Sequence, residues 1–386
     1  MPKEATSTAS RDPRIDLLRG IAVLLVMLLH YSLTYRLPAS WLGEVFTPNA
    51  VARIVMNGNY GVTIFFVISG FLITTNSLRR YGSLEHMDRR AFYTMRAARI
   101  LPPLILALAA ILILGLMGGA SFINEQHGDV LPASYYFVAM GSVLTFWHNV
   151  LMQQVGYFNY SLNIYWSLSV EEVFYLLFPV VCTLLKRWWL IGLGVLLIVV
   201  GPFYRAMHVD DEVDYLYGYL ACFDAIAIGC LTAVLVEHVT LKKTRSVALT
   251  VVGALGLPLV HWQGIGDHEV FGFTGIALFT ACLLITSTTN TAPGRVSMGR
   301  SLLQMPLRAL RWMGRHSYEL YLFHIIVLGC MRDLVPRDAL PAGYKVPWLA
   351  VFVALSALVA FTIARYFAQP LDRWIRSRFV RSAGAK

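Results

Sequence analysis

Long apolar runs separated by short polar segments follow one another along almost the whole chain. Each run is close to the roughly 20 residues that an α-helix needs to cross about 30 Å of hydrocarbon. The pattern predicts an all-α integral membrane protein that spans the membrane about ten times. The predicted spans lie at residues 17–36, 60–78, 99–118, 165–185, 188–204, 217–237, 246–262, 270–288, 317–332 and 346–366.

One further apolar stretch, residues 134–152, contains His148 and Asn149. We interpret it as a re-entrant or interfacial segment. Counting it as a full span would invert everything after it and place most of the later arginines outside, although Lys and Arg concentrate in cytoplasmic loops. Residues 119–164 contain no Lys or Arg at all, as an outer loop should.

The basic residues favour a topology with the N- and C-termini both in the cytoplasm. Most of the 32 Lys and Arg residues then fall in cytoplasmic segments. The exceptions are Arg36, Arg53, Arg205, Arg332, Arg337 and Lys345. The net charge of +10 is then explained by topology and anionic lipid, and no nucleic-acid partner is expected.

Composition supports this class of protein. Hydrophobic residues make up 57% of the chain and charged residues 14%, against about 25% charged in a typical soluble domain. The polar, basic start predicts no cleavable signal peptide. The five cysteines lie in apolar runs without metal-ligand spacing, so we expect buried thiols and no metal. The whole of residues 1–386 is predicted to be one membrane domain with short polar tails.

The first predicted span carries Arg19 and His30 on one face. Eleven residues at 100° each bring the two side chains to within about 20° of each other, roughly 16 Å apart along the axis. Arg19 can alternatively reach lipid phosphate near the cytoplasmic surface. His30 lies within the span, where an ionisable group is a functional candidate, although a hydrogen bond to a neighbouring helix is the simpler alternative.

Glu171 is the predicted partner of His30. It lies about six residues inside the span that enters from the outer side, which places it at a depth similar to that of His30. A carboxylate at that depth can orient an imidazole and raise its basicity. Glu172 should point elsewhere on the helix. The alternative is that both glutamates lie in a wet outer vestibule.

Arginines form a third cluster, on the cytoplasmic side. Arg96 and Arg99 are three residues apart on one helical face, and Pro102 and Pro103 are expected to break the helix just after them. A pair of guanidinium groups can bind phosphate through forked contacts. The alternative is that these arginines only reflect the positive-inside bias.

Five motifs occur in the order seen in the acyltransferase 3 family of membrane acyltransferases, which this chain resembles over roughly residues 14–370. They are the Arg19 and His30 pattern, FFVISGFL at Phe65–Leu72, RAAR at Arg96–Arg99, WSLSVEE at Trp166–Glu172 and SYELYLFH at Ser317–His324. The resemblance implies a multi-pass protein of the bacterial inner membrane. It implies that cytoplasmic acyl-CoA, usually acetyl-CoA, acylates a hydroxyl of a cell-envelope glycan or related sugar.

The same resemblance implies roles for individual residues. His30 is expected to be catalytic, as general base or as acyl carrier, with Glu171 as its acidic partner. The expected coenzyme-binding residues are Arg19, Arg96, Arg99 and Ser69. Pore-lining or structural roles are expected for Trp166, Ser167, Tyr318 and His324.

Two departures and one alternative remain. Ala368 and Gln369 stand where relatives often carry an acid and a base, which argues against a chemical role for this end of the chain. The soluble esterase-like domain appended in some members is not expected here. The alternative function is a transporter with a proton relay through His30, Glu171, Asp224 and His324.

Overall fold

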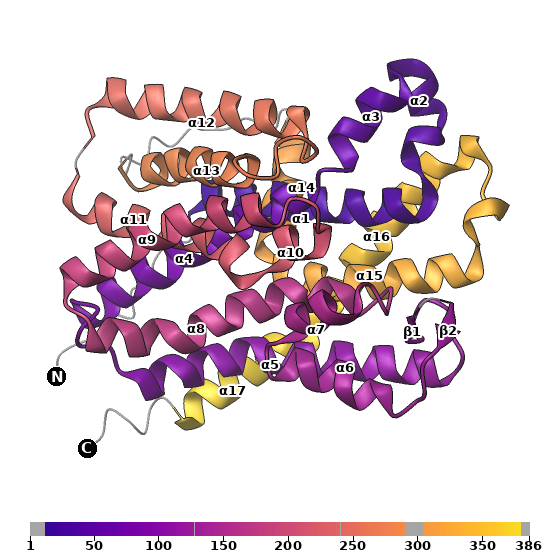
Figure 1. Ribbon diagram of the computed structural model, residues 1–386, viewed down its shortest axis with the longest axis horizontal. Coiled ribbons are helices and arrows are strands. Elements are labelled where there is room, and N and C mark those ends of the chain that lie inside the picture. Colours follow the sequence, from indigo (N-terminus) through magenta and orange to yellow (C-terminus); the bar gives the residue numbers. More distant parts are fainter. Residues whose placement is uncertain (1–11, 127, 240, 290–303, 380–386) are drawn as a thin grey trace.

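The computed structural model describes residues 12–126, 128–239, 241–289 and 304–379. Within these residues nearly every element is a helix (Figure 1), so the predicted all-α class is confirmed. The α-helices are α1 (Pro13–Tyr35), α2 (Trp41–Phe46), α3 (Pro48–Val55), α4 (Asn59–Tyr81), α5 (Arg89–Leu116), α6 (Tyr135–Leu144), α7 (His148–Val155), α8 (Trp166–Leu184), α9 (Arg187–Met207), α10 (Glu212–Tyr217), α11 (Tyr219–His238), α12 (Lys243–Gln263), α13 (Gly272–Thr289), α14 (Gln304–Arg315), α15 (Ser317–Leu334), α16 (Lys345–Ile363) and α17 (Gln369–Phe379).

The remaining elements are short. A two-stranded antiparallel hairpin pairs β1 (Glu125–Gln126) with β2 (Asp129–Val130). The 3₁₀ helices are η1 (Leu37–Ala39), η2 (Asn163–Tyr165), η3 (Arg337–Ala339) and η4 (Ala342–Tyr344), and η5 (Ala364–Ala368) is a π-helix that joins α16 to α17. The hairpin lies toward the opposite end of the molecule from the C-terminal end of α17 (Figure 1).

Eight helical segments of the described chain are long and apolar enough to cross a membrane. They contain α1, α4, α5, α8, α9, α11, α12 and α16. Helices also form at the other two predicted spans. α13 is a shorter apolar helix, and α15 carries Glu319, Arg332 and Asp333 within its 18 residues. The stretch 134–152 forms two short helices, α6 and α7, divided at Phe146, whose φ is 64°, so it makes no single spanning helix.

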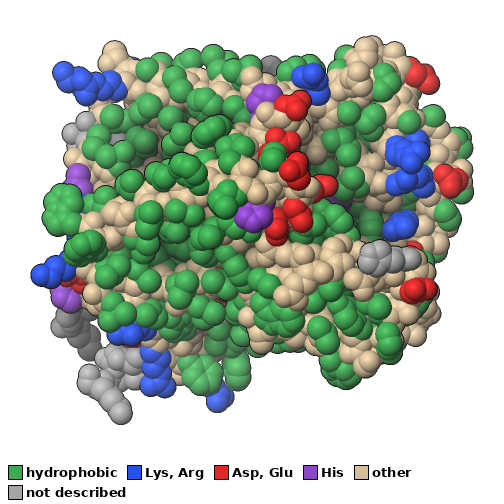
Figure 2. Space-filling view, viewed as in Figure 1, with side chains coloured by type: hydrophobic (Ala, Val, Ile, Leu, Met, Phe, Trp, Pro, Cys, Tyr) green, Lys and Arg blue, Asp and Glu red, His purple; other side chains and the backbone are tan. Residues whose placement is uncertain are grey.

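Hydrophobic side chains cover the outside of the helix bundle. Figure 2 shows them over the face that contains α8, α9 and α12, whereas basic side chains gather toward the two ends. On α9 the exposed residues include Trp188, Trp189, Leu196 and Phe203. An apolar face of this extent is far larger than a soluble monomer exposes and is suited to contact with lipid.

Local sequence explains where the helices that surround the site begin. Asp12 caps α1 by accepting a hydrogen bond from the Arg14 amide at 2.8 Å. Asp88 caps α5 in the same way through the Ala91 amide at 3.0 Å. The predicted break at Pro102 and Pro103 is wrong, because α5 continues through both prolines to Leu116. Packed neighbours can satisfy the carbonyls that prolines leave without a partner inside a helix.

Two glycines bring α4 and α11 into backbone contact. A Cβ atom on Gly70 would lie 2.1 Å from the Ile226 carbonyl oxygen, and one on Gly229 would lie 2.1 Å from the Val67 carbonyl oxygen. Neither distance leaves room for a side chain, so the two helices approach as closely as small residues allow.

A buried ion pair joins α9, α11 and α13. The Arg205 guanidinium donates to Asp224 Oδ2 at 2.8 Å and to Thr274 Oγ1 at 2.6 Å, and its Nε donates to the Val270 carbonyl at 3.0 Å. Arg205 and Asp224 are 0% and 1% exposed. Thr274 also donates to Asp224 Oδ2, at 2.7 Å. The partners of Asp224 all belong to this group of packed helices. Asp224 therefore lies in a separate cluster from the other residues of the proton relay that a transporter would require.

Candidate active site

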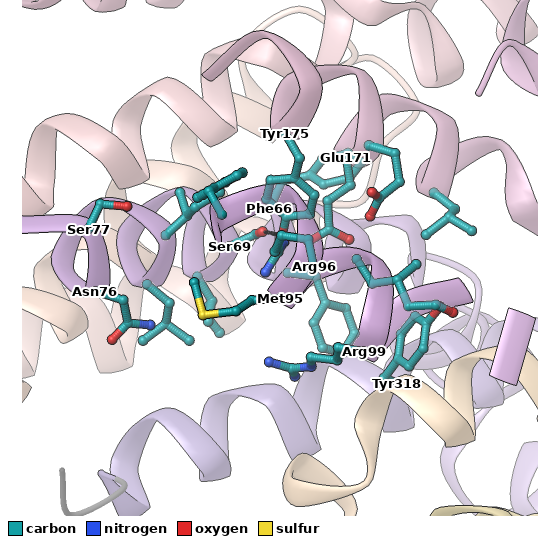
Figure 3. Close-up of a pocket in the computed structure, with 18 of the residues that line it drawn as sticks. Phe66, Ser69, Asn76, Ser77, Met95, Arg96, Arg99, Glu171, Tyr175 and Tyr318 are labelled. Atoms are coloured by element: carbon teal, nitrogen blue, oxygen red, sulfur yellow. Dashed lines mark hydrogen bonds between the residues drawn. The ribbon is translucent and has the colours of Figure 1, made fainter. Parts of the chain in front are cut away.

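A cavity of about 620 Å³ lies between α4, α5, α8 and α15 (Figure 3). Most of its charged groups are arginines. They are Arg19 of α1, Arg79 and Arg80 of α4, Arg96 and Arg99 of α5, and Arg376 of α17. Two carboxylates, Glu171 and Glu172 of α8, line the same cavity. The excess of positive charge suits a ligand that carries several negative charges.

Arg96 lies inside the cavity, whereas Arg99, one turn later on α5, is exposed. The Arg96 guanidinium stacks on the Tyr175 ring, with its central carbon 3.3 Å from the ring centroid. This cation–π contact fixes the plane of the guanidinium. Figure 3 shows Arg96 beside Tyr175 and Ser69, with Arg99 farther along the same wall.

Ser69, Glu171 and Tyr175 form a compact hydrogen-bonded group. Ser69 Oγ donates to Glu171 Oε1 at 2.5 Å, Tyr175 donates to the same oxygen, and the two hydroxyls also contact each other. Ser69 comes from the middle of α4, while Glu171 and Tyr175 are one turn apart on α8. The group ties α4 to α8 beneath the Arg96 guanidinium.

Several buried polar atoms of the cavity wall lack a protein partner among the described residues. They are Arg96 Nε, Glu172 Oε1 and Ser317 Oγ. A buried polar group without a hydrogen bond is energetically unfavourable, so such atoms generally meet water or a ligand. Their position on one cavity indicates that its occupant is polar as well as anionic.

His30 and His324 form a pair just beyond this cavity. His324 Nε2 lies 3.4 Å from His30 Nδ1, and the ring centroids are 5.2 Å apart. His30 Nδ1 is 2.8 Å from the Val26 carbonyl, and His324 Nδ1 is 2.8 Å from the Tyr321 carbonyl. Because carbonyls only accept, we assign both protons to Nδ1. His324 then turns a lone pair toward His30, and Nε2 of His30 is unprotonated.

Tyr321 lies between the cavity and the histidine pair. It lines the cavity, and neither histidine does. Its ring centroid is 5.9 Å from that of His324, which follows one turn later on α15. The cavity and the histidines are therefore adjacent compartments with one shared wall.

The structure brings most of the predicted binding residues together. Arg19, Arg96, Arg99 and Ser69 all line the cavity, as do Ser167 and Tyr318. Trp166 packs instead against Tyr217, with ring centroids 4.4 Å apart. Among the described residues, no group of three or more His, Cys, Asp and Glu side chains is arranged to hold a metal ion.

The predicted contact between His30 and Glu171 is wrong. Among the described residues His30 meets His324, while Glu171 accepts from Ser69 and Tyr175. The prediction placed the start of the span at the membrane surface. In the structure the Tyr165 hydroxyl donates to the Leu322 carbonyl at 2.9 Å, so α8 begins beside α15 near His324. Glu171 is six residues further along, about 9 Å deeper.

Four charged residues of the cavity were not predicted to belong to the site. Glu172 was expected to point elsewhere, but it is buried and lines the cavity. Arg79 and Arg80 were interpreted only as topology signals, and both lie in the last turn of α4. Arg376 reaches the cavity from α17, held by Asp372 at 2.6 Å. No local pattern marks this long-range contact.

Comparison with known proteins gives a consistent set of relatives. A family model described as an acyltransferase domain matches residues 12–366. The chain is 26% identical over 387 residues to the O-acetyltransferase OatA of Staphylococcus aureus, covering 94% of this chain and 57% of that protein. It is 25% identical over 383 residues to the peptidoglycan O-acetyltransferase OatA of Listeria monocytogenes, covering 94% and 56%.

A third relative is the putative peptidoglycan O-acetyltransferase YrhL of Bacillus subtilis, 25% identical over 394 residues, with 96% of this chain and 56% of the relative covered. The chain thus spans little more than half the length of these curated relatives. No solved structure matches it.

Proposed function

This chain belongs to the acyltransferase 3 family, and from that membership we propose that it transfers an acyl group, most simply acetyl, from cytoplasmic acyl-CoA to a hydroxyl of a cell-envelope glycan. One observation carries the proposal. A cavity with six arginines on its wall ends one helical turn before a pair of histidines. An anionic donor can be held in the first compartment while its reactive end approaches the second.

The donor fits the cavity by its chemistry. Coenzyme A carries phosphates at one end and a thioester at the other, and arginine forks are well suited to phosphate. Arg79, Arg80, Arg99 and Arg376 are assigned to the phosphates. The amides of the pantetheine arm are candidates to satisfy Arg96 Nε, Glu172 Oε1 and Ser317 Oγ. Ser317 and His324 are seven residues apart on α15, so the arm has about 10 Å to cover along that wall.

His30 is assigned the central chemical role. In one route, Nε2 takes the proton of the acceptor hydroxyl as its oxygen attacks the thioester carbonyl, and the proton then passes to the departing CoA sulfur. In the other, Nε2 attacks the carbonyl and CoA is displaced as the thiolate, and the acceptor hydroxyl then displaces the acyl group from the ring while its proton passes to the thiolate. Both routes create positive charge on His30, which the His324 lone pair near Nδ1 stabilises.

Glu171 is proposed to act on the donor side of the reaction. It is fixed by Ser69 and Tyr175, and Tyr175 in turn carries the Arg96 guanidinium on its ring. The carboxylate thus determines where Arg96 points. Because the direct partners of Glu171 are the Ser69 and Tyr175 hydroxyls, any effect of Glu171 on catalysis would be transmitted through these two residues and across the cavity.

The proposed acceptor and its side of the membrane are inferred from the relatives and from the predicted topology. Two of the relatives are named as peptidoglycan O-acetyltransferases, one of them putatively, so a peptidoglycan sugar is the first acceptor to test. We propose ten spans in the bacterial inner membrane with both termini inside. This orientation puts the arginine cavity in contact with cytoplasmic donor.

Sealed membrane vesicles of defined orientation test the whole proposal. Inside-out vesicles with peptidoglycan fragments trapped in the lumen should transfer label from radioactive acetyl-CoA to the fragments. Sealed right-side-out vesicles should transfer none until detergent opens them. Equal labelling by both kinds of sealed vesicle would place the donor site on the wrong side, and no labelling of any acceptor would remove the acyltransferase assignment.

A substitution tests the donor cavity itself. Arg96→Lys should raise the KM for acetyl-CoA about tenfold, because an ammonium group can neither stack as a plane on Tyr175 nor present the planar set of N–H donors that would meet the pantetheine amides. Arg90→Lys is the matched control, since Arg90 is an exposed arginine of the same helix that does not line the cavity. An unchanged KM in the Arg96 variant would mean that the cavity does not bind the coenzyme.

A further inference from the structure

Tyr321, which separates the cavity from the histidine pair, bears on the length of the acyl group that the donor can carry. Resting on the function proposed above, we propose that Tyr321 and Phe65 limit the length of the transferred acyl group, so that the enzyme prefers acetyl donors and uses each longer chain less well. Both residues line the cavity. Tyr321 is the residue that also contacts His324.

Tyr321 is held firmly in place. Its hydroxyl donates to the Ile164 carbonyl at 2.8 Å, and the Ser167 hydroxyl lies 2.6 Å from the Tyr321 hydroxyl oxygen. Its backbone carbonyl accepts a hydrogen bond from His324 Nδ1 at 2.8 Å. The two hydrogen bonds of its hydroxyl hold the ring between the cavity and His324, and turning the ring aside breaks both of them.

Phe65 faces Tyr321 from α4. The ring centroids are 6.5 Å apart at an interplanar angle of 74°, an edge-to-face contact. Three further apolar residues that line the cavity lie close in sequence to Phe65 or Ser167, namely Val62, Phe66 and Leu168. Together with the two rings they offer apolar surface that suits the hydrocarbon part of an acyl group.

Space beyond this wall is limited by rings already in contact. The centroid separations are 5.9 Å from Tyr321 to His324 and 5.2 Å from His324 to His30. The acyl group is the tip of the donor, so when the thioester carbonyl reaches His30 its remaining carbons must lie among these rings. Each added methylene has to push rings apart, and a tight pocket discriminates about 10–200-fold per methylene.

Donor selectivity tests the inference. Purified protein would be assayed with acetyl-, propionyl-, butyryl- and hexanoyl-CoA, with release of free CoA thiol and acyl transfer to glycan both measured. For Tyr321→Ala the ratio of kcat/KM for butyryl-CoA to that for acetyl-CoA should rise at least about tenfold. Tyr321→Phe, which keeps the ring but loses the hydrogen bonds that hold it, should raise this ratio less than Tyr321→Ala does.

A second pair of variants guards against simple misfolding. Phe65→Ala removes the facing wall without touching the hydrogen bonds of Tyr321, and it should shift the ratio in the same direction. Tyr165→Phe is the control, because it loses one buried hydroxyl bond to α15 at a residue that does not line the cavity. Its ratio should not move.

The outcomes separate this inference from the function on which it rests. If wild-type protein uses acetyl-CoA and the ratio is unchanged in both Tyr321→Ala and Phe65→Ala, the length limit lies elsewhere and the inference is wrong while the function stands. Efficient use of hexanoyl-CoA by wild-type protein would also overturn it. Wild-type protein that consumes no acyl-CoA at all would overturn both together.

Discussion

Replacing His30 with alanine is expected to lower acyl transfer by about 1,000-fold while the protein still folds and inserts. General-base catalysis by a positioned side chain contributes about 10²–10⁴-fold, and the alternative acyl-histidine route has no substitute for the ring at all. Removing the half-buried imidazole takes away only its contacts with the Val26 carbonyl and with His324, and it leaves no charged group without a partner. Initial rates of label transfer, normalised to protein that elutes as a single detergent-solubilised species, measure the effect.

Two companion variants locate the partner of His30. His324→Ala should slow transfer by about 10–100-fold, because the lone pair that stabilises charge on His30 is lost while the reacting nitrogen stays. Glu171→Gln should instead act through the donor, raising the KM for acetyl-CoA by disturbing Arg96. Full activity in His30→Ala would end the mechanism. Activity in His30→Ala together with a dead Glu171→Gln would transfer the basic role to the glutamate.

The second large effect is on stability, at the buried ion pair of Arg205 and Asp224. Asp224→Ala should lower the free energy of unfolding by about 3–5 kcal/mol, because it leaves the charge of Arg205 buried without its partner. Fluorescence-monitored thermal unfolding in a mild detergent, with wild-type and variant in the same buffer, measures the loss as a fall in the midpoint.

A double variant is the matched control for this pair. Arg205→Met combined with Asp224→Leu removes both charges together, so most of the lost stability should return, since paired apolar replacements of buried ion pairs are often close to neutral. A double variant as unstable as Asp224→Ala would show that shape, and not the unpaired charge, dominates at this position. A single variant as stable as wild-type would show that water reaches Arg205.

Sequence alone predicted the helices well, because each apolar run has the length and composition that a spanning helix requires. The exception has a physical cause. The helix at Pro102 and Pro103 continues where local propensity predicts a break. Tertiary contacts outweigh the local preference there.

The site was predicted in part. Arg96 and Ser69 were expected to bind the coenzyme, and both line the cavity. The pairing of His30 failed because depth was counted from the sequence start of each span, and α8 begins well inside the molecule. Tyr321 and Arg376 were missed altogether. Both residues line the cavity because of the way the helices pack against one another, and a hydropathy pattern does not predict which helices pack together.

Because of the close contact between α4 and α11, one side of the cavity should move less readily than the other. Gly70 lies against the backbone of α11 and Gly229 against that of α4, so the α4 wall has little room to shift. The opposite side includes α17, which supplies Arg376 and is joined to α16 by the π-helix Ala364–Ala368, an irregular segment at which a helix can bend. If the cavity binds the proposed coenzyme, entry and release should therefore displace α17 more than α4.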